Sequence, residues 1–272
     1  MTDGPLFLQP KEIEARILQT RLPSPQYSIV IPAYNERDRI TSTLERILAY
    51  AGRHHWDAEV IVVNDGSRDE TAEIVGEFAA RNSMVRLLQN PGNRGKGYSV
   101  RNGMLHATGE ILLFSDADLA SPIEEAEKLF AAIAGGADIA IGSRWINAGL
   151  QTQRQPIHRQ LMGRTFNILM RLFLGLGYKD TQCGFKAFKR STAQILFQFQ
   201  KIERWGFDPE LLYLARKFGL KVVEVPVAWA HQEGARINPV RDGLRMIGDL
   251  WTVRWNALRG KYAKPVTLDR AV

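Results

Sequence analysis

The sequence lacks several features that would assign it to a membrane-spanning or disulfide-stabilised class. It has one cysteine in 272 residues, Cys183, so no disulfide can form within the chain. A single cysteine agrees with a reducing compartment. No segment reaches the roughly 18–20 consecutive apolar residues that a membrane-spanning helix needs. The best candidate, ILMRLFLGLGY, is too short and contains Arg171, so we expect a soluble or peripheral protein.

The N-terminal segment also lacks the pattern of a signal peptide. MTDGPLFLQPKEIEARILQ contains acidic residues and an early proline, and it has no long apolar core. We expect residues 1–26 to form an extension with a short helix around 12–19, followed by a proline-containing linker. Apolar residues make up 45% of the chain, which is ordinary for a globular protein with a buried core.

Charge is the strongest compositional signal. The formal net charge is +7, which favours a polyanionic partner: nucleic acid, an anionic membrane surface or a phosphorylated substrate. The sequence contains no recognisable nucleic-acid-binding module, and its basic residues alternate with carboxylates. We therefore expect no nucleic acid partner. Neither Cys183 nor the five histidines show metal-ligand spacing.

From Tyr27 onward, short apolar β-branched runs alternate with segments of helical periodicity. This alternation predicts an α/β fold with a mostly parallel sheet flanked by helices. The runs are nearly continuously apolar, as strands buried on both faces should be. The predicted strands are 27–31, 58–65, 85–89, 110–118 and 137–144, and the predicted helices are 38–51, 69–82, 97–109 and 121–134.

After Arg144 the rhythm changes. We expect a basic amphipathic segment over 150–177, a loop entering a short strand over 180–190, a helix over 208–219 and a strand over 221–230. The expected domain spans 27–232, and 233–272 is expected to be a basic amphipathic helix and tail. Its helical stripe contains two tryptophans flanked by arginines, which suits either a membrane-interface helix or a helix packed on the core. The stripe is Leu244, Ile247, Trp251, Trp255 and Leu258, flanked by Arg241, Arg245, Arg254 and Arg259.

The chemistry gathers at one predicted edge. In open parallel sheets, ligands bind outside the carboxyl ends of the strands, near the point where the strand order reverses. Carboxylates and cations follow the predicted strands in turn. In strand order they are Tyr34, Asn35 and Glu36, then Asp65, then Lys96, then Asp116 and Asp118, then Arg144.

Asp116 and Asp118 are the most specific of these residues. Alternation along a strand puts positions two apart on the same face, where two carboxylates repel unless a cation lies between them. Hard oxygen ligands beside a diphosphate suit Mg²⁺ or Mn²⁺. Ser121, Pro122 and Glu124 can start the following helix as a capping box, so the aspartates are not needed for that.

Asp65 and Lys96 each allow two interpretations. If Ser67 and Glu70 cap the next helix, Asp65 is free to bind a base or ribose; otherwise it is a turn-forming aspartate before Gly66. The segment GNRGKG lacks Walker spacing and follows the third strand, not the first, which disfavours a nucleotide-dependent oxidoreductase. Lys96 within it either binds phosphate or is a solvated loop lysine.

Six motifs in order carry a resemblance to a known family. They are VIPAYNE, VNDGSRDET, NRGKGYSVRNGM, FSDADLASP, IAIGSR and DTQCGFKAF, and the later ERWGFDPELLYLA adds to them. Together they resemble family 2 glycosyltransferases with the GT-A fold. The likeness is greatest to dolichyl-phosphate glucosyltransferases and polyprenyl-phosphate mannosyl- and glucosyltransferases, and it covers residues 27–229. Each motif alone is modest, but six in order are highly specific.

The resemblance implies roles for individual residues. Pro32, Tyr34 and Glu36 would line the nucleotide base and ribose, Asp65 would hold the base, and Lys96 and Asp116 would contact the nucleotide sugar. Asp116 with Asp118 would bind a divalent metal on the donor diphosphate. Arg144 would bind the acceptor phosphate, and Asp180 matches an active-site aspartate, so the implied catalytic residues are Asp118, Arg144 and Asp180. One departure is Ala120, where some relatives have a metal-binding glutamine.

The implied reaction is inverting hexose transfer, with UDP-glucose favoured, to a dolichyl or polyprenyl phosphate. GDP-mannose as donor and a soluble hydroxyl acceptor stay open. A phosphate acceptor needs cations, which Arg144, Arg154 and Arg159 would supply. A hydroxyl acceptor needs a base, for which Asp208 is the candidate unless it is the N-cap before Pro209. The expected location is cytoplasmic, peripheral on the cytoplasmic face of the membrane.

Overall fold

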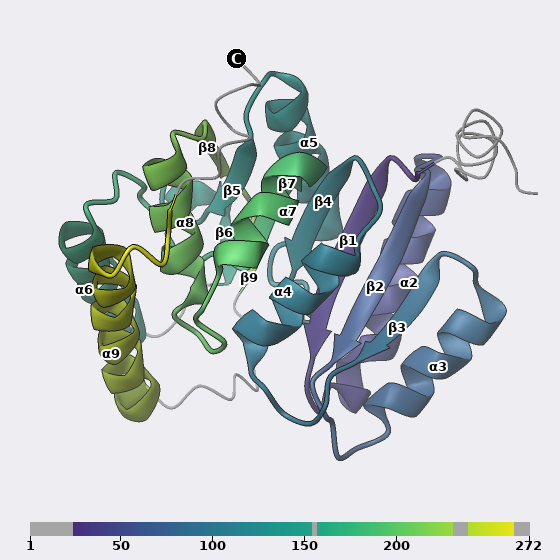
Figure 1. Cartoon of the computed structure of the whole chain (residues 1–272). Helices are drawn as coiled ribbons and strands as arrows, with labels where there is room; N and C mark the ends of the chain where they lie inside the picture. The colour runs from purple at the N-terminus through teal and green to yellow at the C-terminus, as the bar shows by residue number, and fades with distance from the viewer. Residues whose placement is uncertain (1–23, 154–156, 231–238, 264–272) are drawn as a thin grey trace, which may run out of the picture.

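The computed structural model describes residues 24–153, 157–230 and 239–263. A seven-stranded sheet with the order β3-β2-β1-β4-β7-β5-β8 lies at its centre (Figure 1). Every neighbouring pair is parallel except those of β7, which runs antiparallel to β4 and to β5. The predicted mostly parallel α/β fold is confirmed. The strands are β1 (Tyr27–Ala33), β2 (Ala58–Asn64), β3 (Val85–Gln89), β4 (Ile111–Ser115), β5 (Ile139–Ser143), β7 (Phe185–Lys189) and β8 (Val222–Pro226).

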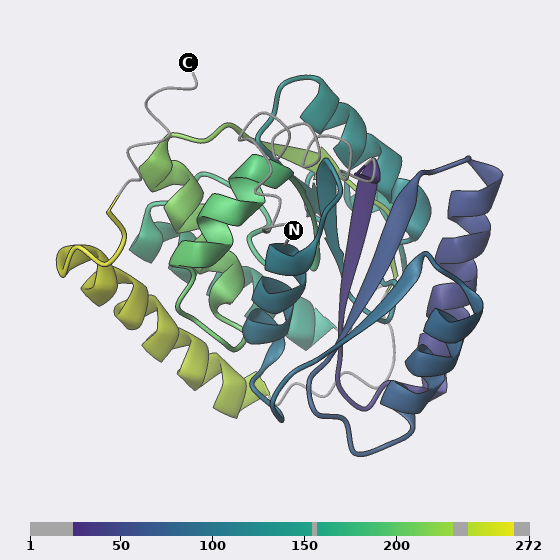
Figure 2. The same ribbon diagram turned by 45° about the vertical axis from the view of Figure 1, so that its right-hand side comes forward.

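Helices cover both faces of this sheet (Figure 2). One buried cluster unites the sheet with α2, α3 and α5, and a second unites it with α4, α6, α7, α8 and α9. In β1, Ile29 and Ile31 belong to the first cluster and Val30 to the second, so the apolar run serves both faces. The helices are α2 (Arg37–Arg53), α3 (Thr71–Arg81), α4 (Lys96–His106), α5 (Ala126–Ala134), α6 (Ile157–Leu174), α7 (Arg190–Phe199), α8 (Phe207–Phe218) and α9 (Pro239–Leu258).

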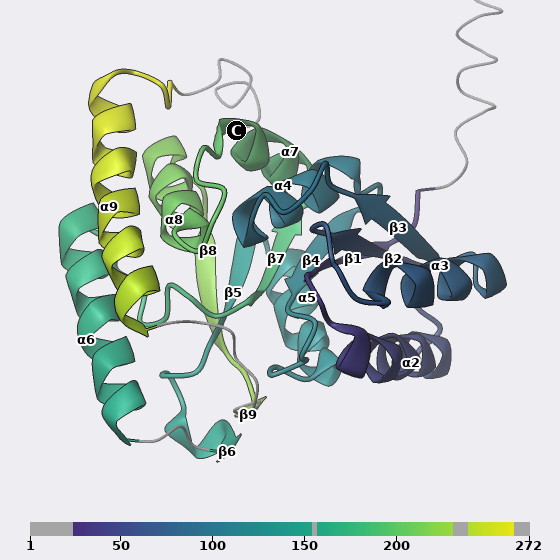
Figure 3. The same ribbon diagram turned by 90° about the horizontal axis from the view of Figure 1, so that it is seen from below.

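Helices α6 and α9 lie side by side at the end of the molecule away from α2 and α3 (Figure 3). The C-terminal end of α6 is capped by guanidinium groups. Arg254 of α9 donates to the carbonyl of Phe173 at 3.0 and 2.6 Å, and Arg216 of α8 donates to the carbonyls of Leu174 and Gly175. The last carbonyls of a helix have no partner within it, so these contacts join three helices.

The structure corrects two local predictions. Helix 121–134 begins as a 3₁₀ turn (Ile123–Glu125), and Ser121 makes no cap; its Oγ lies 3.9 Å from Cys183 Sγ. Glu124 instead forms an ion pair with Arg46 at 2.9 Å. Ser67 likewise does not cap α3, because its Oγ accepts a hydrogen bond from the backbone of Asn35.

The later elements differ from the sequence analysis as well. Helix α7 was not predicted. The expected strand 221–230 divides into β8 and β9 (Trp229–Ala230), and β9 pairs with β6 (Gln151–Gln153) in a separate two-stranded sheet. The short helix expected around 12–19 lies outside the described residues, and the proposed boundary at 232–233 stays a prediction.

The buried carboxylate of Glu59 links separate segments of the chain at the amino-terminal edge of the sheet. It accepts hydrogen bonds from Ser28 Oγ at 2.7 Å, from the backbone of Thr108 at 2.6 Å and from Thr108 Oγ1 at 2.7 Å, and it pairs with Arg86. Burial alone would raise the pKa of Glu59, but the hydrogen bonds from Thr108, Ser28 and Arg86 outweigh it and hold the pKa below its ordinary value. The charged form of Glu59 therefore stabilises the fold.

We expect Glu59→Gln to lower the free energy of unfolding by about 1–3 kcal/mol at neutral pH, because hydrogen-bond donors lose a charged acceptor. A carboxyl with a lowered folded-state pKa contributes stability above its unfolded-state pKa and loses that contribution as pH falls through the folded value. The difference between wild type and variant should shrink on acidification. Urea unfolding at neutral and acidic pH measures this, and a difference independent of pH would contradict it.

Candidate active site

The strand order reverses beside β1, which pairs with β2 on one side and with β4 on the other. Ligand sites of open α/β sheets form at the carboxyl end of such a point. The turns that leave β1 and β4 there contain Tyr34 to Glu36 and Asp116 to Asp118. These two turns therefore lie side by side at the edge where the sequence predicted them.

The turn after β1 is shaped by Asn35, whose φ of 54° lies in the left-handed region that asparagine tolerates. Its backbone donates to Ser67 Oγ at 2.9 Å, and its Oδ1 accepts from the backbone of Arg68 at 2.7 Å. Glu36 forms an ion pair with Arg39 at 2.8 Å. Pro32, Tyr34 and Glu36 are partly exposed along this turn, which leaves surface for a ligand.

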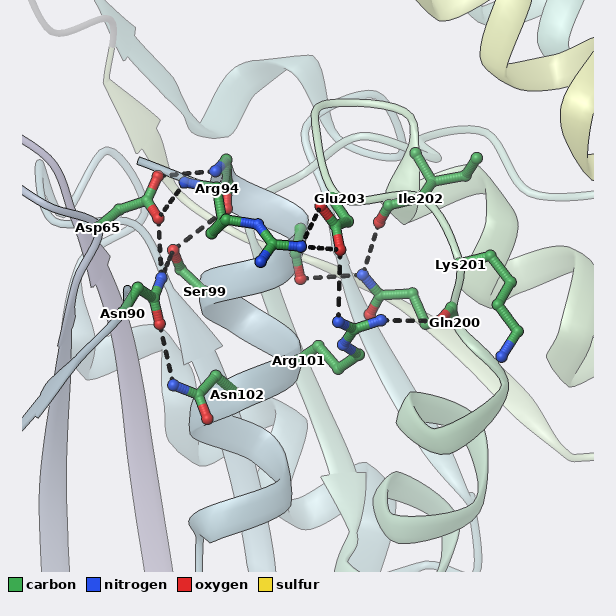
Figure 4. A network of polar contacts seen from close by, with 12 residues as sticks. Asp65, Asn90, Arg94, Ser99, Arg101, Asn102, Gln200, Lys201, Ile202 and Glu203 are labelled. Atoms are coloured by element: carbon green, nitrogen blue, oxygen red, sulfur yellow. Dashed lines mark hydrogen bonds and ion pairs between the residues drawn. The ribbon is translucent and has the colours of Figure 1, made fainter. Parts of the chain in front are cut away.

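Asp65, at the end of β2, is not free as the capping-box argument expected. Its buried carboxylate accepts hydrogen bonds from Asn90 Nδ2 at 2.8 Å, the backbone of Arg94 at 2.9 Å and the backbone of Gly95 at 2.8 Å (Figure 4). A carboxylate offers about four acceptor positions, so about one is left. Asp65 thus holds the glycine-rich turn that precedes α4.

Part of the glycine-rich turn is already bound by other parts of the protein. The amides of Arg94 and Gly95 point to Asp65, and the amide of Tyr98 donates to the carbonyl of Glu203 at 2.9 Å. These donors already have protein acceptors. The turn also presents the side chain of Lys96 to the site.

Lys96 is not a solvated loop lysine, because its side chain is only 17% exposed. Its ammonium lies 2.5 Å from Asp116 Oδ1, and 5.3 and 5.0 Å from the ring centres of Phe114 and Trp205. Burial would lower the pKa of Lys96, but the charges of Asp116 and Asp208 outweigh it and hold the pKa above its ordinary value. Lys96 therefore stays charged beside Asp116.

Asp116 and Asp118 lie in the turn after β4, which ends at Ser115, so strand alternation does not bring them together. They are nonetheless close. Burial first, and then the negative charge of Asp116, raise the pKa of Asp118. Gly184 packs against Asp116, because a Cβ atom there would collide with its carboxylate. A larger residue at 184 would displace Asp116.

The two aspartates fit a divalent cation that is shared with a substrate. Among the described residues, no group of three or more histidine, cysteine, aspartate or glutamate side chains could hold a metal ion. Two repelling carboxylates supply hard oxygen ligands, and Mg²⁺ sites commonly take their other ligands from substrate phosphates and water. The two carboxylates therefore suit a divalent metal ion only if its remaining ligands come from water or a bound phosphate.

Arg144 and Asp180 form a buried, forked ion pair. Asp180 has no exposed surface, and its carboxylate accepts from Arg144 Nε at 2.7 Å, Nη2 at 2.9 Å and the backbone amide at 3.0 Å. Burial opposes both charges, yet each holds the other ionised, so the pKa of Arg144 is raised and that of Asp180 is lowered. The rings of Trp145 and Trp229 flank the guanidinium at 5.6 Å each. Asp180 orients Arg144.

Asp208 is neither a helix cap nor a free base. The cap position of α8 is Gly206, and Asp208 Oδ1 lies 2.6 Å from Lys186 Nζ in the interior. Lys186 also donates to the carbonyl of Cys183 at 2.5 Å. Burial raises the pKa of Asp208, although Lys186 and Lys96 oppose this. The negative charge of Asp208 therefore offsets the positive charges of Lys186 and Lys96.

Two predicted acceptor arginines stay predictions. Arg154 lies outside the described residues, and Arg159 lies in α6 with a side chain that is also outside them. The sequence analysis missed other members of the site, chiefly Glu224, whose carboxylate accepts from the amides of Lys179 and Asp180 at 2.8 Å each. Lys186, Glu203 and Trp205 were missed too, because no local pattern marks a residue whose partner is distant in sequence.

Breaking the Arg144–Asp180 pair should be costly. We expect Asp180→Asn to lower the free energy of unfolding by about 3–5 kcal/mol, because it leaves a guanidinium that is only 20% exposed without its counter-charge. Urea unfolding measures the change. Glu77→Gln, in an exposed ion pair with Arg81, is the control and should cost less than about 1 kcal/mol. Equal losses in the two variants would contradict this account of the pair.

The fold is similar to those of solved glycosyltransferases. The Mycobacterium tuberculosis glucosyl-3-phosphoglycerate synthase crystallised with UDP is 20% identical, with a TM-score of 0.59 and coverage of 97% of this chain and 88% of that one. The Rubrobacter xylanophilus mannosyl-3-phosphoglycerate synthase is 17% identical, with a TM-score of 0.61 and coverage of 92% and 77%. The Mycobacterium enzyme has also been crystallised with Mn²⁺, UDP and its product. At these identities the likeness establishes the expected GT-A fold.

Sequence comparisons establish the family. A dolichyl-phosphate beta-glucosyltransferase of Trichomonas vaginalis is 43% identical over 218 residues, which are 76% of this chain and 65% of that protein. Those of Drosophila melanogaster and Homo sapiens are 38% and 34% identical over 92% and 88% of this chain, and 82% and 78% of their own lengths. Residues 28–197 match the model of glycosyl transferase family 2. This chain belongs to that family and is a glycosyltransferase.

Proposed function

We propose that this enzyme transfers glucose from UDP-glucose to a dolichyl or polyprenyl phosphate, with inversion and with the help of a divalent metal ion. The observation that carries the proposal is that two charged sites lie near each other. Asp116, Asp118 and Lys96 form the first site, and the ion pair of Arg144 with Asp180 forms the second. The charge of Asp116 contributes to the raised pKa of Arg144, so the two sites act within electrostatic reach of each other. The names of the relatives at 34–43% identity support the same substrates.

The donor would lie along the turns after β1, β2 and β4. Pro32, Tyr34 and Glu36 would line the base and ribose, and the remaining acceptor position of Asp65 would serve the base. Asp116 and Asp118 would hold Mg²⁺ or Mn²⁺, which when bound neutralises charge on a leaving diphosphate. Lys96 would add a fixed positive charge there.

The acceptor side explains why no free base is needed. A lipid phosphate is already anionic at neutral pH, so it attacks the anomeric carbon directly and the donor α-linkage becomes a β-linkage. Its approach to the diphosphate is repulsive, and Arg144, oriented by Asp180, would offset that repulsion; Arg154 and Arg159 are proposed to assist. The buried ion pair of Asp208 with Lys186 supports a phosphate acceptor over a hydroxyl acceptor, because Asp208 is engaged and not available as a base.

The direct test is transfer of labelled glucose from UDP-glucose to dolichyl phosphate with Mg²⁺ or Mn²⁺. We expect a chelator to abolish labelling and Asp118→Asn to reduce it by about a hundredfold or more, because charge on the diphosphate is then less well neutralised. Asp57→Asn, an exposed aspartate at the opposite edge of the sheet, is the matched control and should leave the rate unchanged.

Other outcomes would redirect the proposal. Labelling only from GDP-mannose would change the sugar and keep the lipid acceptor. Transfer only to a soluble hydroxyl acceptor would contradict the lipid phosphate and return attention to Asp208. Full activity of the chelated enzyme would contradict the metal.

We also propose that the enzyme binds the cytoplasmic face of a membrane through α6 and α9. No described helix is long and apolar enough to cross a bilayer. Large apolar side chains nonetheless face solvent on both helices, and Phe173 joins the two rows through its ring contact with Trp251 at 5.0 Å. Arg254 lies in α9 and Arg259 directly follows it, and both are exposed. Their positive charges suit an anionic membrane interface. The exposed apolar residues are Ile168, Leu169 and Leu172 on α6 and Ile247, Trp251, Trp255 and Leu258 on α9.

Removing the two tryptophans tests this surface. We expect Trp251→Ser with Trp255→Ser to weaken binding to anionic phospholipid vesicles by about tenfold or more in flotation experiments, because interfacial tryptophans and apolar area are lost. Leu105→Ser, on α4 and 38% exposed, is the control for loss of an exposed apolar residue and should not affect binding. Unchanged flotation of the double variant would exclude α9 from the membrane contact.

A further inference from the structure

Residues 200–206, called here the 200–206 loop, lie against the first turn of α4 (Figure 4). Tyr98 donates its amide to the carbonyl of Glu203 at 2.9 Å, and Gln200 Nε2 donates to the carbonyl of Gly97 at 2.9 Å. A Cβ atom on Gly97 would lie 2.7 Å from the carbonyl oxygen of Ile202. The loop and the start of α4 therefore touch backbone to backbone, and a shift of one moves the other.

Charged side chains connect the same loop to Asp65 (Figure 4). The carboxylate of Glu203 accepts from Arg94 Nη2 at 3.0 and 3.1 Å and lies 3.6 Å from Arg101 Nη2. Arg94 is also the residue whose amide Asp65 binds. At the other end of the loop, the ring of Trp205 covers the ammonium of Lys96. The loop thus contacts both sides of the proposed donor site.

The loop is in turn held from behind by a buried carboxylate, Glu210 of α8. It has no exposed surface, and it accepts from the amides of Lys201 at 2.9 and 3.1 Å and of Ile202 at 2.8 Å. The hydroxyl of Tyr262, which follows α9 and is fully buried, donates to the same carboxylate at 2.5 Å. Glu210 therefore fixes two consecutive amides of the loop.

Helix α9 contacts the far end of the loop as well. The amide of Gly206 donates to the carboxylate of Asp249, and a Cβ atom on Gly206 would lie 2.5 Å from Asp249 Oδ2. The helix with the exposed Trp251 and Trp255 therefore also braces the loop.

We propose that Glu210, supported by Tyr262 and Asp249, is a positioning residue of the donor site. It acts through the 200–206 loop, which keeps Trp205 and the first turn of α4 in place and thereby holds the Lys96 ammonium beside Asp116. The functional part rests on the proposed function; the positioning of Lys96 does not. Glutamine at 210 would turn an amide group toward backbone donors, so at least one donor would lose its acceptor and the loop would loosen.

The test compares Glu210→Gln with Glu59→Gln. Both change a buried carboxylate that accepts from backbone amides, but Glu59 lies at the opposite edge of the sheet. The first readout is the rate at which an amine-reactive reagent labels Lys96, followed by peptide mass spectrometry under conditions where both variants are folded. We expect about a fivefold or greater increase for Glu210→Gln and none for Glu59→Gln. The second readout is the KM for UDP-glucose, which should rise in Glu210→Gln alone.

Each outcome decides the proposal. Equal Lys96 labelling in the two variants would overturn it. Faster labelling of Lys96 in Glu210→Gln would support the positioning role even if the wild type transferred no glucose. That lack of transfer would contradict the proposed function alone. If Glu210→Gln does not fold, Tyr262→Phe takes its place, with Tyr213→Phe in α8 as its control; the same difference in labelling is expected, and its absence would overturn the proposal.

Discussion

The site depends on pairing charges that the fold withdraws from water. Lys96 meets Asp116, Lys186 meets Asp208 and Arg144 meets Asp180, with N–O distances of 2.5, 2.6 and 2.7 Å. A buried charge without a partner costs far more free energy than a single ordinary contact returns. These pairs therefore link the start of α4 to the segment that contains Asp116, the start of α8 to the strand β7, and the connecting segments that contain Arg144 and Asp180 to each other, and the position of any one charge depends on its neighbours.

The antiparallel strand β7 is what brings these pairs together. It lies between β4 and β5, so the segment before it, with Asp180, Cys183 and Gly184, passes between the aspartate turn and Arg144. Asp116 donates its amide to the carbonyl of Gly184, and Asp180 binds Arg144. One segment consequently positions both the Asp116 carboxylate and the Arg144 guanidinium, which under the proposed function would serve the donor and the acceptor.

The C-terminal helices add further contacts around these ion pairs. Helix α9 has buried Met246, Leu250 and Val253 on one face and exposed tryptophans on another. Its buried face packs beside α6 and α8, and Asp249 reaches the 200–206 loop. Helix α9 therefore combines an exposed apolar surface with a contact to the 200–206 loop, and under the proposed function it would link membrane contact to support of the donor site.

The sequence alone predicted the first five strands, the mostly parallel sheet and the edge at which Asp65, Lys96, Asp116 and Arg144 lie, because apolar periodicity and strand-end polarity are local signals. It did not predict the antiparallel course of β7 or the separate β6–β9 pair, which depend on contacts between distant segments. Only the tertiary structure decided what those side chains do there. Asp65 holds the glycine-rich turn, although the local pattern suggested a free carboxylate. Asp180 orients Arg144, a role that the sequence had left open. Asp208 pairs with Lys186, although the local pattern suggested a helix cap or a base. Ser67 and Ser121 matched capping boxes but are used elsewhere. The physical reason is that a polar side chain is satisfied by whichever donor or acceptor the packed chain brings nearest, and that partner is often far away in sequence.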